Sequence, residues 1–133
     1  MKQSVMSTAS VSIIAIFFGA GLGALLRALF NVLAESFSSS IPIGTLIANL
    51  LGAYLVGIAL AYFIDQPTIS PQWRLFIITG FLGGLTTFSS FSAEVVQLMQ
   101  RDQLLLALGL ALMHVCGSLL LTFLGIWTVH TFK

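Results

Sequence analysis

Four long apolar segments dominate the chain and set the class of fold that it can adopt. They span residues 11–34, 43–64, 75–97 and 104–128, and each exceeds the roughly 20 apolar residues with which a helix crosses a bilayer. Only 7% of all residues are charged, whereas a soluble domain carries roughly 25%. So few charges cannot cover a water-facing surface. The sequence therefore predicts an all-α membrane protein, with four transmembrane helices in a single domain over residues 1–133.

Short polar connections separate the apolar segments. Serines gather at residues 36–42, two prolines lie within residues 65–71, and a brief charged turn covers residues 100–103. Such residues interrupt helices, and connections this short make neighbouring helices antiparallel. The first apolar segment is too long for the apolar region of a signal peptide, and no cleavage motif of small residues follows it. We therefore expect it to remain as a helix.

The positive charges are spread almost evenly over the two ends of such a bundle. Four spans place both termini on one side together with the connection between the second and third helices, so that Lys2, Arg74 and Lys133 share that side. The other side holds Arg101, and also Arg27 if its side chain extends that way. The positive-inside rule needs a larger excess to fix one orientation. The weak bias permits insertion in both orientations and hence an antiparallel dimer.

Several classes of function are disfavoured by the composition. A net charge of +1 argues against a nucleic-acid partner and against a polybasic lipid-binding surface. The single Cys116 excludes an internal disulfide and a multi-cysteine metal site. The chain has no Ser/His/Asp constellation with a plausible base and orienting acid, and Asp65 and Asp102 fall in connections. We therefore expect a protein that is not an enzyme.

The stretch Gly80–Phe91, inside the third apolar segment, does not suit a plain lipid-facing helix. It holds three glycines, four hydroxyl residues and three phenylalanines. Gly83 and Gly84 each lower helix propensity by about 1 kcal/mol, and the hydroxyl side chains that follow compete for backbone groups. Irregular backbone at membrane depth is tolerated only where it is buried in protein or lines a cavity. We expect the third helix to be broken in the middle, beside a site for something small and polar.

Arg27 and Asn49 are polar positions in the first two apolar segments that each leave two interpretations open. Arg27 shares a helix face with Gly19 and Gly23, so its side chain either points into protein or a water-filled vestibule, or extends to the interface. Asn49 either hydrogen-bonds between helices or turns its amide donors toward a polar pathway.

The third and fourth segments add further polar candidates. Glu94 lies near the end of its segment, where an interfacial position costs little. His114, Ser118 and Thr122 recur at intervals of four residues and form a polar stripe about 12 Å long. For His114 itself, a packed neutral ring is favoured over a proton site. The candidates offer an amide, hydroxyls and positive phenyl edges but no ring of carboxylates, which favours a small, hard anion over a cation.

These motifs, in this order, resemble the Fluc (CrcB) fluoride channel family. The resemblance rests on Gly83–Phe91 with Glu94, on Gly44-Thr-Leu-Ile-Ala-Asn49, on Gly23-x-x-x-Arg27 and on His114-x-x-x-Ser118-x-x-x-Thr122. Ser90 stands where a threonine is common, and Ala28 stands where an aromatic residue is usual. The resemblance implies a channel for passive fluoride export, which lowers fluoride toxicity, in the lipid of a bacterial inner membrane. It also implies an antiparallel, dual-topology homodimer.

The resemblance further implies a role for each candidate residue. Phe88 and Phe91 would be ring-edge fluoride ligands of two pores, and Arg27 would lie at a vestibule. Backbone carbonyls of Gly83 and Thr86 would hold a structural Na+ at the dimer centre. The remaining pore donors would be Asn49, Ser89, Ser118 and Thr122.

Two other functions fit a small four-helix membrane protein. A proton-coupled multidrug exporter of the dual-topology type needs a membrane-embedded carboxylate, typically in its first helix. Here the first segment has no acid before Glu35 at its end, and Glu94 is the other candidate. A structural subunit without transport would use the polar residues only to join helices. Fluoride release from liposomes separates these alternatives from a channel.

Overall fold

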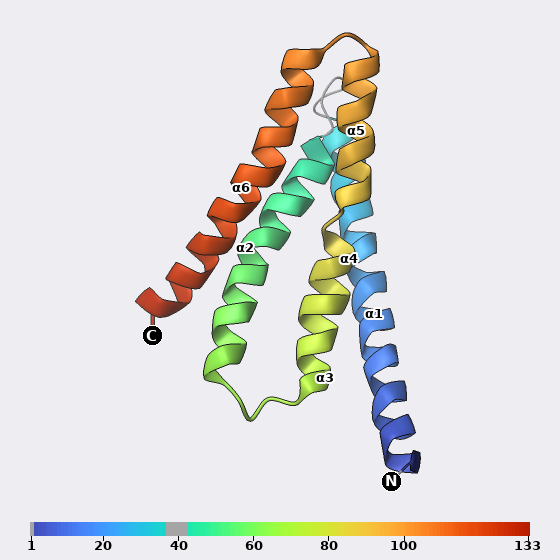
Figure 1. The fold of residues 1–133 in the computed structure, drawn as a ribbon, viewed down its shortest axis with the longest axis vertical. Coiled ribbons are helices and arrows are strands. Elements are labelled where there is room, and N and C mark those ends of the chain that lie inside the picture. The colour runs from blue at the N-terminus through green and yellow to red at the C-terminus, as the bar shows by residue number, and fades with distance from the viewer. Residues whose placement is uncertain (1, 37–42) are drawn as a thin grey trace.

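The computed structural model describes residues 2–36 and 43–133, and over these residues the regular structure is helical (Figure 1). Helix α1 covers Lys2–Glu35, α2 covers Ile43–Asp65 and α6 covers Leu104–Thr131. Between α2 and α6 lie four shorter elements, which are α3 (Pro71–Arg74), η1 (Leu75–Leu82), α4 (Gly83–Leu85) and α5 (Phe88–Gln100). The serine cluster expected at residues 36–42 lies, apart from residue 36, outside the described residues.

Four helical segments are long and apolar enough to cross a membrane, which confirms the expected number of spans. They are Thr8–Glu35, Ile43–Asp65, Pro71–Gln100 and Leu104–Thr131, with mean hydropathy between 1.4 and 2.3. The third segment is the longest and the least apolar, because it contains the polar stretch described above. Pro67 and the charged turn lie in the connections between segments, as expected, whereas Pro71 is the first residue of α3.

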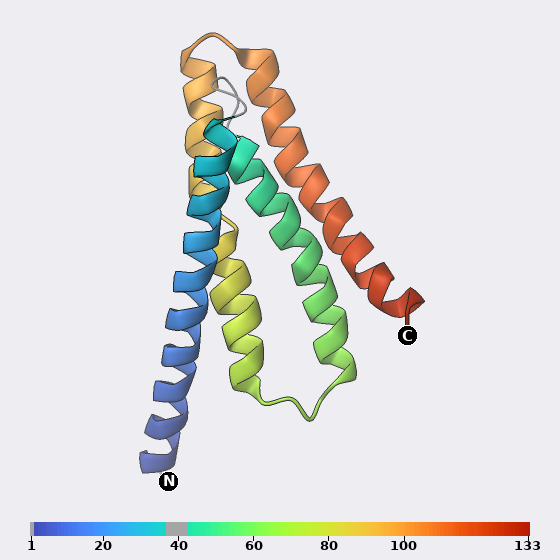
Figure 2. The same cartoon turned by 180° about the vertical axis from the view of Figure 1, so that it is seen from behind.

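The helices form two packed pairs that splay apart toward one end. Figures 1 and 2 show α2 beside α6, and α1 beside the first half of the third segment, while α5 turns back into α6. The N-terminus and the connection between α2 and α3 lie at one end of the molecule. The tight turn between α5 and α6 lies at the other end, where Asp102 adopts a left-handed φ of 58°. Aspartate tolerates this conformation better than most residues.

Glycines allow the close approach within each pair. A Cβ at Gly23 would collide with the carbonyl of Phe81 and lie 2.6 Å from the amide nitrogen of Leu85. A Cβ at Gly57 would meet the carbonyl of Thr122 in the same way. Small residues at such crossings are typical of membrane helices, whose association depends on close packing. The glycine face of α1 therefore contacts η1 and α4, and Gly57 lets α2 lie against α6.

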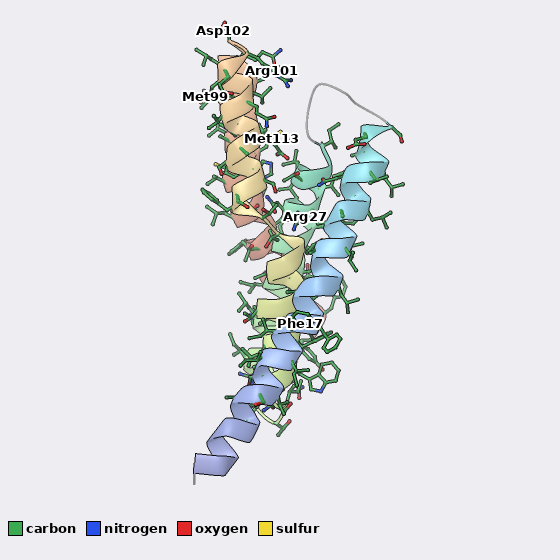
Figure 3. All side chains as sticks on the ribbon, turned by 90° about the vertical axis from the view of Figure 1, so that its right-hand side faces the viewer. Phe17, Arg27, Met99, Arg101, Asp102 and Met113 are labelled. Atoms are coloured by element: carbon green, nitrogen blue, oxygen red, sulfur yellow. The ribbon has the colours of Figure 1, made fainter. Side chains whose placement is uncertain are left out.

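Much of the apolar surface faces outward. The most buried cluster consists of Ala48, Ala59, Phe63, Leu82 and Leu85. By contrast, Phe17 is 72% exposed, and Met99 and Met113 are about half exposed (Figure 3). Charged side chains such as Arg101 and Asp102 lie in the turn at one end (Figure 3). This distribution suits a chain whose outer surface meets lipid.

The third segment is interrupted, as the sequence predicts, at two extended residues. Thr86 has φ −83° and ψ 152°, and Thr87 has φ −150° and ψ 124°. Figure 1 shows the uncoiled stretch between α4 and α5. The Thr87 hydroxyl accepts a hydrogen bond from the amide of Ser90 at 3.2 Å, so Thr87 is the N-cap that starts α5.

The interruption begins just after the two glycines rather than at them. Gly83 and Gly84 remain helical, and a Cβ at Gly84 would collide with the backbone of Ala20 in α1. Glycine is required there for the packing of two helices. Preceding them, η1 is an eight-residue stretch of the wider π-helix, which is rare and which nothing in the hydrophobic pattern predicts.

Candidate functional site

Asn49 of α2 hydrogen-bonds the backbone at the break in the third segment. Its side-chain oxygen accepts a hydrogen bond from the Thr87 amide at 2.7 Å, and its Nδ2 donates to the Thr87 carbonyl at 2.9 Å. An extended residue inside a membrane helix leaves backbone groups that must find partners. Asn49 supplies both partners for Thr87 and is itself only 9% exposed.

The other donor of the Asn49 amide is directed at α6. Nδ2 lies 3.0 Å from Nδ1 of His114. The two bonds to Thr87 fix the orientation of the amide, because a backbone N–H only donates and a carbonyl only accepts. Both N–H groups of Asn49 are therefore directed at protein acceptors, and the expected interhelical bonding is observed.

Two phenylalanines extend this group on α5. The His114 ring stacks on the ring of Phe91, with centroids 4.4 Å apart and an interplanar angle of 27°. Phe91 meets Phe88 edge to face at 5.4 Å. Phe91 is 8% exposed, whereas Phe88 is 76% exposed. Although the two rings are equivalent by spacing, one lies inside the chain and the other at its surface.

A cavity of about 330 Å³ opens beside these groups. Its walls come from α2, from the break, from α5 and from α6. None of the described residues in its walls has a carboxylate or a permanently charged cation. The lining residues are Asn49, Ala53, Thr86, Thr87, Phe88, Phe91, His114, Val115 and Ser118. The structure thus brings Asn49, both phenylalanines and Ser118 together at one site.

Ser89 and Thr122 lie near this cavity but not in its lining. The Ser89 hydroxyl is 3.2 Å from that of Thr87, at the start of α5. The Thr122 hydroxyl donates to the carbonyl of Ala53 at 3.1 Å. In this structure the Thr122 proton is therefore used to join α6 to α2.

Arg27 of α1 also lies beside the break. Its Nε donates to the carbonyl of Gly84 at 3.3 Å, so the guanidinium satisfies a carbonyl near the end of α4. Of the two interpretations left open by the sequence, contact with protein is the one observed.

The carbonyls of Gly83 and Thr86 have lost the donors that an unbroken helix would give them. The helical donor for Gly83 would be the amide of Thr87, which instead binds Asn49. The donor for Thr86 would be the amide of Ser90, which instead binds the Thr87 hydroxyl. Carbonyls freed in this way at a helix break are suitable cation ligands.

A second polar cluster joins Glu94, which the sequence singled out, to Thr45 and Asn31, which it did not. The Thr45 hydroxyl donates to Glu94 Oε1 at 2.6 Å and lies 3.5 Å from Asn31 Oδ1. The other carboxylate oxygen of Glu94 is buried and has no partner among the described residues. Glu94 is therefore bonded to α2 near one end of the bundle, where an interfacial position stays a prediction. Thr45 lies four residues before Asn49, so the shared face of α2 was a signal that could have indicated it.

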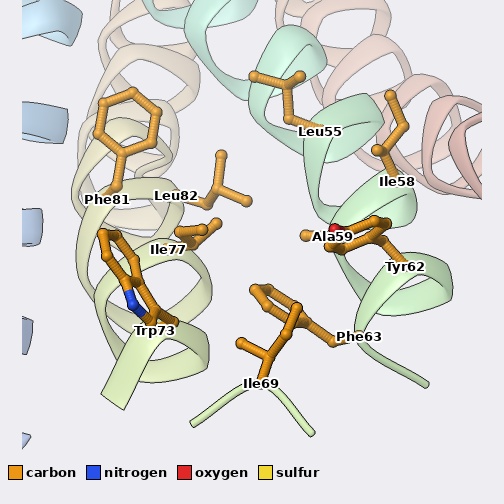
Figure 4. A pocket seen from close by; sticks show the side chains of 10 residues that line it. All are labelled: Leu55, Ile58, Ala59, Tyr62, Phe63, Ile69, Trp73, Ile77, Phe81 and Leu82. Carbon is orange, nitrogen blue, oxygen red and sulfur yellow. The ribbon is translucent and has the colours of Figure 1, made fainter. Parts of the chain in front are cut away.

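A larger cavity of about 560 Å³ lies between α2 and η1, toward the connection between α2 and α3 (Figure 4). Trp73, Ile77, Phe81 and Leu82 line one side of it, and residues of α2 with Ile69 line the other. Apart from the hydroxyl of Tyr62 and the ring nitrogen of Trp73, its lining side chains are apolar. It lacks the convergent donors that an ion site requires, so the smaller polar cavity is the candidate site.

Comparison with known proteins agrees on one family. The family model described as "CrcB-like protein, Camphor Resistance (CrcB)" matches residues 14–126, which include all residues of the candidate site. A fluoride-specific ion channel FluC of Polynucleobacter asymbioticus is 63% identical over 123 residues, covering 92% of this chain and 98% of the relative. Proteins of the same name from Pseudomonas aeruginosa and Chromobacterium violaceum are 57% and 56% identical, over 90% and 86% of this chain and 94% and 91% of the relatives.

Proposed function

The chain belongs to the CrcB family, and we propose that it is a fluoride-specific ion channel of the bacterial plasma membrane. It is a multi-pass membrane protein with four spans, and it lets fluoride leave the cytoplasm passively, which lowers fluoride toxicity. The observation that best supports this function is the polar cavity at the break in the third segment. It lies within the matched residues and combines donors with an absence of carboxylates among the residues that line it.

The chemistry of this cavity favours a small anion. The edges of Phe88 and Phe91 carry the positive part of the ring quadrupole. Ser118 lines the cavity and makes no hydrogen bond to a described residue, so its hydroxyl is free to donate. A passing ion must be bound strongly enough to enter and weakly enough to leave. Neutral donors without a fixed cation meet both conditions.

Each predicted pore residue has a role in the proposal. Phe88, Phe91 and Ser118 contact fluoride directly, and Asn49 stabilises the extended backbone of the break beside them. Ser89 extends the row of hydroxyls on α5, and Thr122 extends the row on α6 beyond Ser118. Two of these assignments carry a structural condition. The Asn49 amide and the Thr122 hydroxyl donate to protein acceptors. Each would therefore have to break one of these hydrogen bonds before it could donate to the ion.

Arg27 belongs to the entrance in this proposal. Its Nε binds Gly84 at the break, which places a positive charge near the cavity without making it a wall residue. A cation so placed raises the local concentration of anions.

The proposed channel is an antiparallel homodimer. The even distribution of basic residues permits both orientations in the membrane. Phe88 is 76% exposed on one chain, and a second copy would cover it and complete the wall of the pore. The apolar cavity between α2 and η1 gives the same partner a surface to pack against (Figure 4).

A sodium ion at the dimer centre is part of the same proposal. The carbonyls of Gly83 and Thr86 fit such an ion, because the amides that a continuous helix would offer them are bonded elsewhere. Sodium would supply positive charge between two breaks and so stabilise the dimer.

The multidrug exporter fits this chain poorly. It needs a carboxylate in the first helix, but the first acid of the chain is Glu35 at the end of α1. Family membership also points elsewhere. A purely structural subunit would not require an unpaired hydroxyl such as that of Ser118 beside a cavity.

Fluoride release from liposomes tests the proposed function. Purified protein is placed in liposomes loaded with potassium fluoride, and external fluoride is measured with an electrode after an ionophore opens a path for potassium. We expect rapid release without any proton gradient, and no comparable release from liposomes loaded with chloride. Release that depends strictly on a proton gradient, or no release beyond that of protein-free liposomes, would reject the channel.

A further inference from the structure

Arg74, the last residue of α3, binds the carbonyl end of α2. Its Nη2 donates to the Phe63 carbonyl at 2.9 Å and to the Gln66 carbonyl at 3.3 Å. The guanidinium also lies over the Phe63 ring, 5.7 Å from the centroid. The last carbonyls of a helix lack partners within the helix and carry its negative partial charge. Arg74 therefore joins the start of the third segment to the end of α2.

Stability alone does not explain an arginine at this place. Its Nε is buried and has no hydrogen-bond partner among the described residues, so part of the cost of removing the cation from water is not offset. An apolar side chain could cover Phe63, which is 5% exposed, without that cost. The best-attested use of such polar groups is to fix the register between packed helices.

The packing between α2 and the first half of the third segment leaves their register open. The apolar cavity of about 560 Å³ separates α2 from η1 over this stretch (Figure 4). Apolar contacts have no preferred direction, and atoms that face a void lack partners on that side. Within the part of the chain that the structure describes, only Arg74 forms hydrogen bonds between the residues of α2 with Gln66 and the third segment before the break. Arg74 is thus the directional contact that sets where this half lies along α2.

The position of that half decides whether the break meets Asn49. Asn49 lies about 21 Å from Phe63 along α2, at 1.5 Å per residue. It binds both backbone groups of Thr87, at 2.7 and 2.9 Å. Packed helices shift past one another in steps of about one turn, roughly 5.4 Å. Such a step would take the backbone of Thr87 out of reach of the Asn49 side chain.

We infer that Arg74 is a positioning residue of the fluoride site, which fixes the first half of the third segment along α2 so that the break meets Asn49. This inference rests on the proposed function. Arg74 is not among the residues that line the polar cavity, so it does not contact the ion. It acts through Thr87, whose extended backbone is part of the cavity wall.

Fluoride release from liposomes gives the first readout. Arg74→Met keeps an unbranched apolar side chain but removes the donors. Loss of one hydrogen bond to a charged group shifts an equilibrium about tenfold, so we expect release to fall about tenfold or more. Arg74→Lys keeps a charged donor, and its release should lie between that of Arg74→Met and wild type.

Arg101→Met is the matched control. It removes an exposed cation from the other end of the molecule (Figure 3), whose side chain has no hydrogen-bond partner within residues 2–36 and 43–133. We expect this variant to release fluoride at the wild-type rate. An equal loss in Arg101→Met and Arg74→Met would overturn the inference, because the effect would then come from net charge.

Nitrogen-15 NMR of asparagine-labelled protein in liposomes separates positioning from stability. The Nδ2 signal of Asn49 reports its bonds to Thr87 and His114. Asn31 is the other asparagine of the chain, and Asn31→Asp identifies its signal. A residue that only stabilises the fold would leave the Asn49 signal of the folded protein unchanged. We expect Arg74→Met to shift that signal and Arg101→Met to leave it in place.

Thermal unfolding and gel filtration check that each variant folds. If Arg74→Met does not fold, Arg74→Gln, which keeps one donor, is measured in its place with the same expected direction of change. Wild-type release from the folded variant, or lost release with an unchanged Asn49 signal, would overturn the inference while the channel stands. If wild-type protein releases no fluoride, the proposed function falls, and the Asn49 signal still tests whether Arg74 positions the break.

Discussion

Replacing Asn49 with alanine should destabilise the protein and disorder the break at the same time. The substitution removes three hydrogen bonds, two to the backbone of Thr87 and one to His114. Side-chain hydrogen bonds between membrane helices contribute about 0.6 kcal/mol on average and at most about 1.7 kcal/mol each, so three give about 2 to 5 kcal/mol. The part-buried amide and carbonyl of Thr87 would be left without partners, which adds to the expected loss.

The assay is the free energy of unfolding in detergent micelles, obtained from titration with a denaturing detergent and followed by circular dichroism. Leu51→Ala is a matched control, because Leu51 lies on the same helix but is 38% exposed. We expect its loss to be well below that of Asn49→Ala. Asn49→Asp keeps an acceptor for the Thr87 amide but loses donors, so it should resemble alanine. A free energy of unfolding for Asn49→Ala within about 0.5 kcal/mol of wild type is what an ordinary surface substitution gives. That result would show that Asn49 does not stabilise the break.

Three further predictions follow from packing, capping and the cavity. Gly23→Ala should cost about 1–3 kcal/mol of unfolding free energy, because its Cβ collides with the third segment, while Gly21→Ala, which meets nothing within 4 Å, should be neutral or slightly stabilising; equal effects in denaturant titration would contradict the packing. Thr87→Val should lower the free energy of unfolding by about 1 kcal/mol, because it removes the N-cap of α5. Thr87→Ser keeps the capping hydroxyl, so in the same titration it should retain most of the wild-type stability. Phe88→Ile and Phe91→Ile should each abolish fluoride release from liposomes while the oligomer seen by gel filtration persists, and unchanged release would refute their role as ligands.

The four spans could be predicted because hydropathy is summed over whole segments, so no single residue decides the outcome. The interruption of the third segment was also predictable, since Gly83, Gly84 and the hydroxyl residues after them all weaken a helix. Its position was not. Gly84 stays helical because Ala20 of another helix packs against it, and only the tertiary structure shows whether a glycine serves packing or breakage.

Four predicted residues, Asn49, Phe88, Phe91 and Ser118, do line one cavity, but the bonds among the residues there could not be predicted. Phe88 and Phe91 are alike by spacing, yet they differ almost tenfold in exposure. Asn49 was expected either to join helices or to offer donors, and its partners Thr87 and His114 come from segments 38 and 65 positions away. Glu94 was expected near the interface from its position near a helix end, but its hydrogen bond to Thr45 was not predicted. Such pairings depend on how helices cross, which a single sequence does not encode locally.

The central claim is that this chain conducts fluoride selectively, and the reversal potential across a planar bilayer tests it most directly. Purified protein is studied with a tenfold fluoride gradient in one direction and an equal chloride gradient in the other. We predict a current that reverses at the fluoride equilibrium potential, about 59 mV for a tenfold gradient of a monovalent ion, and that disappears in Phe91→Ile. Reversal near the chloride or cation potential, or the absence of a protein-dependent current, would contradict the account.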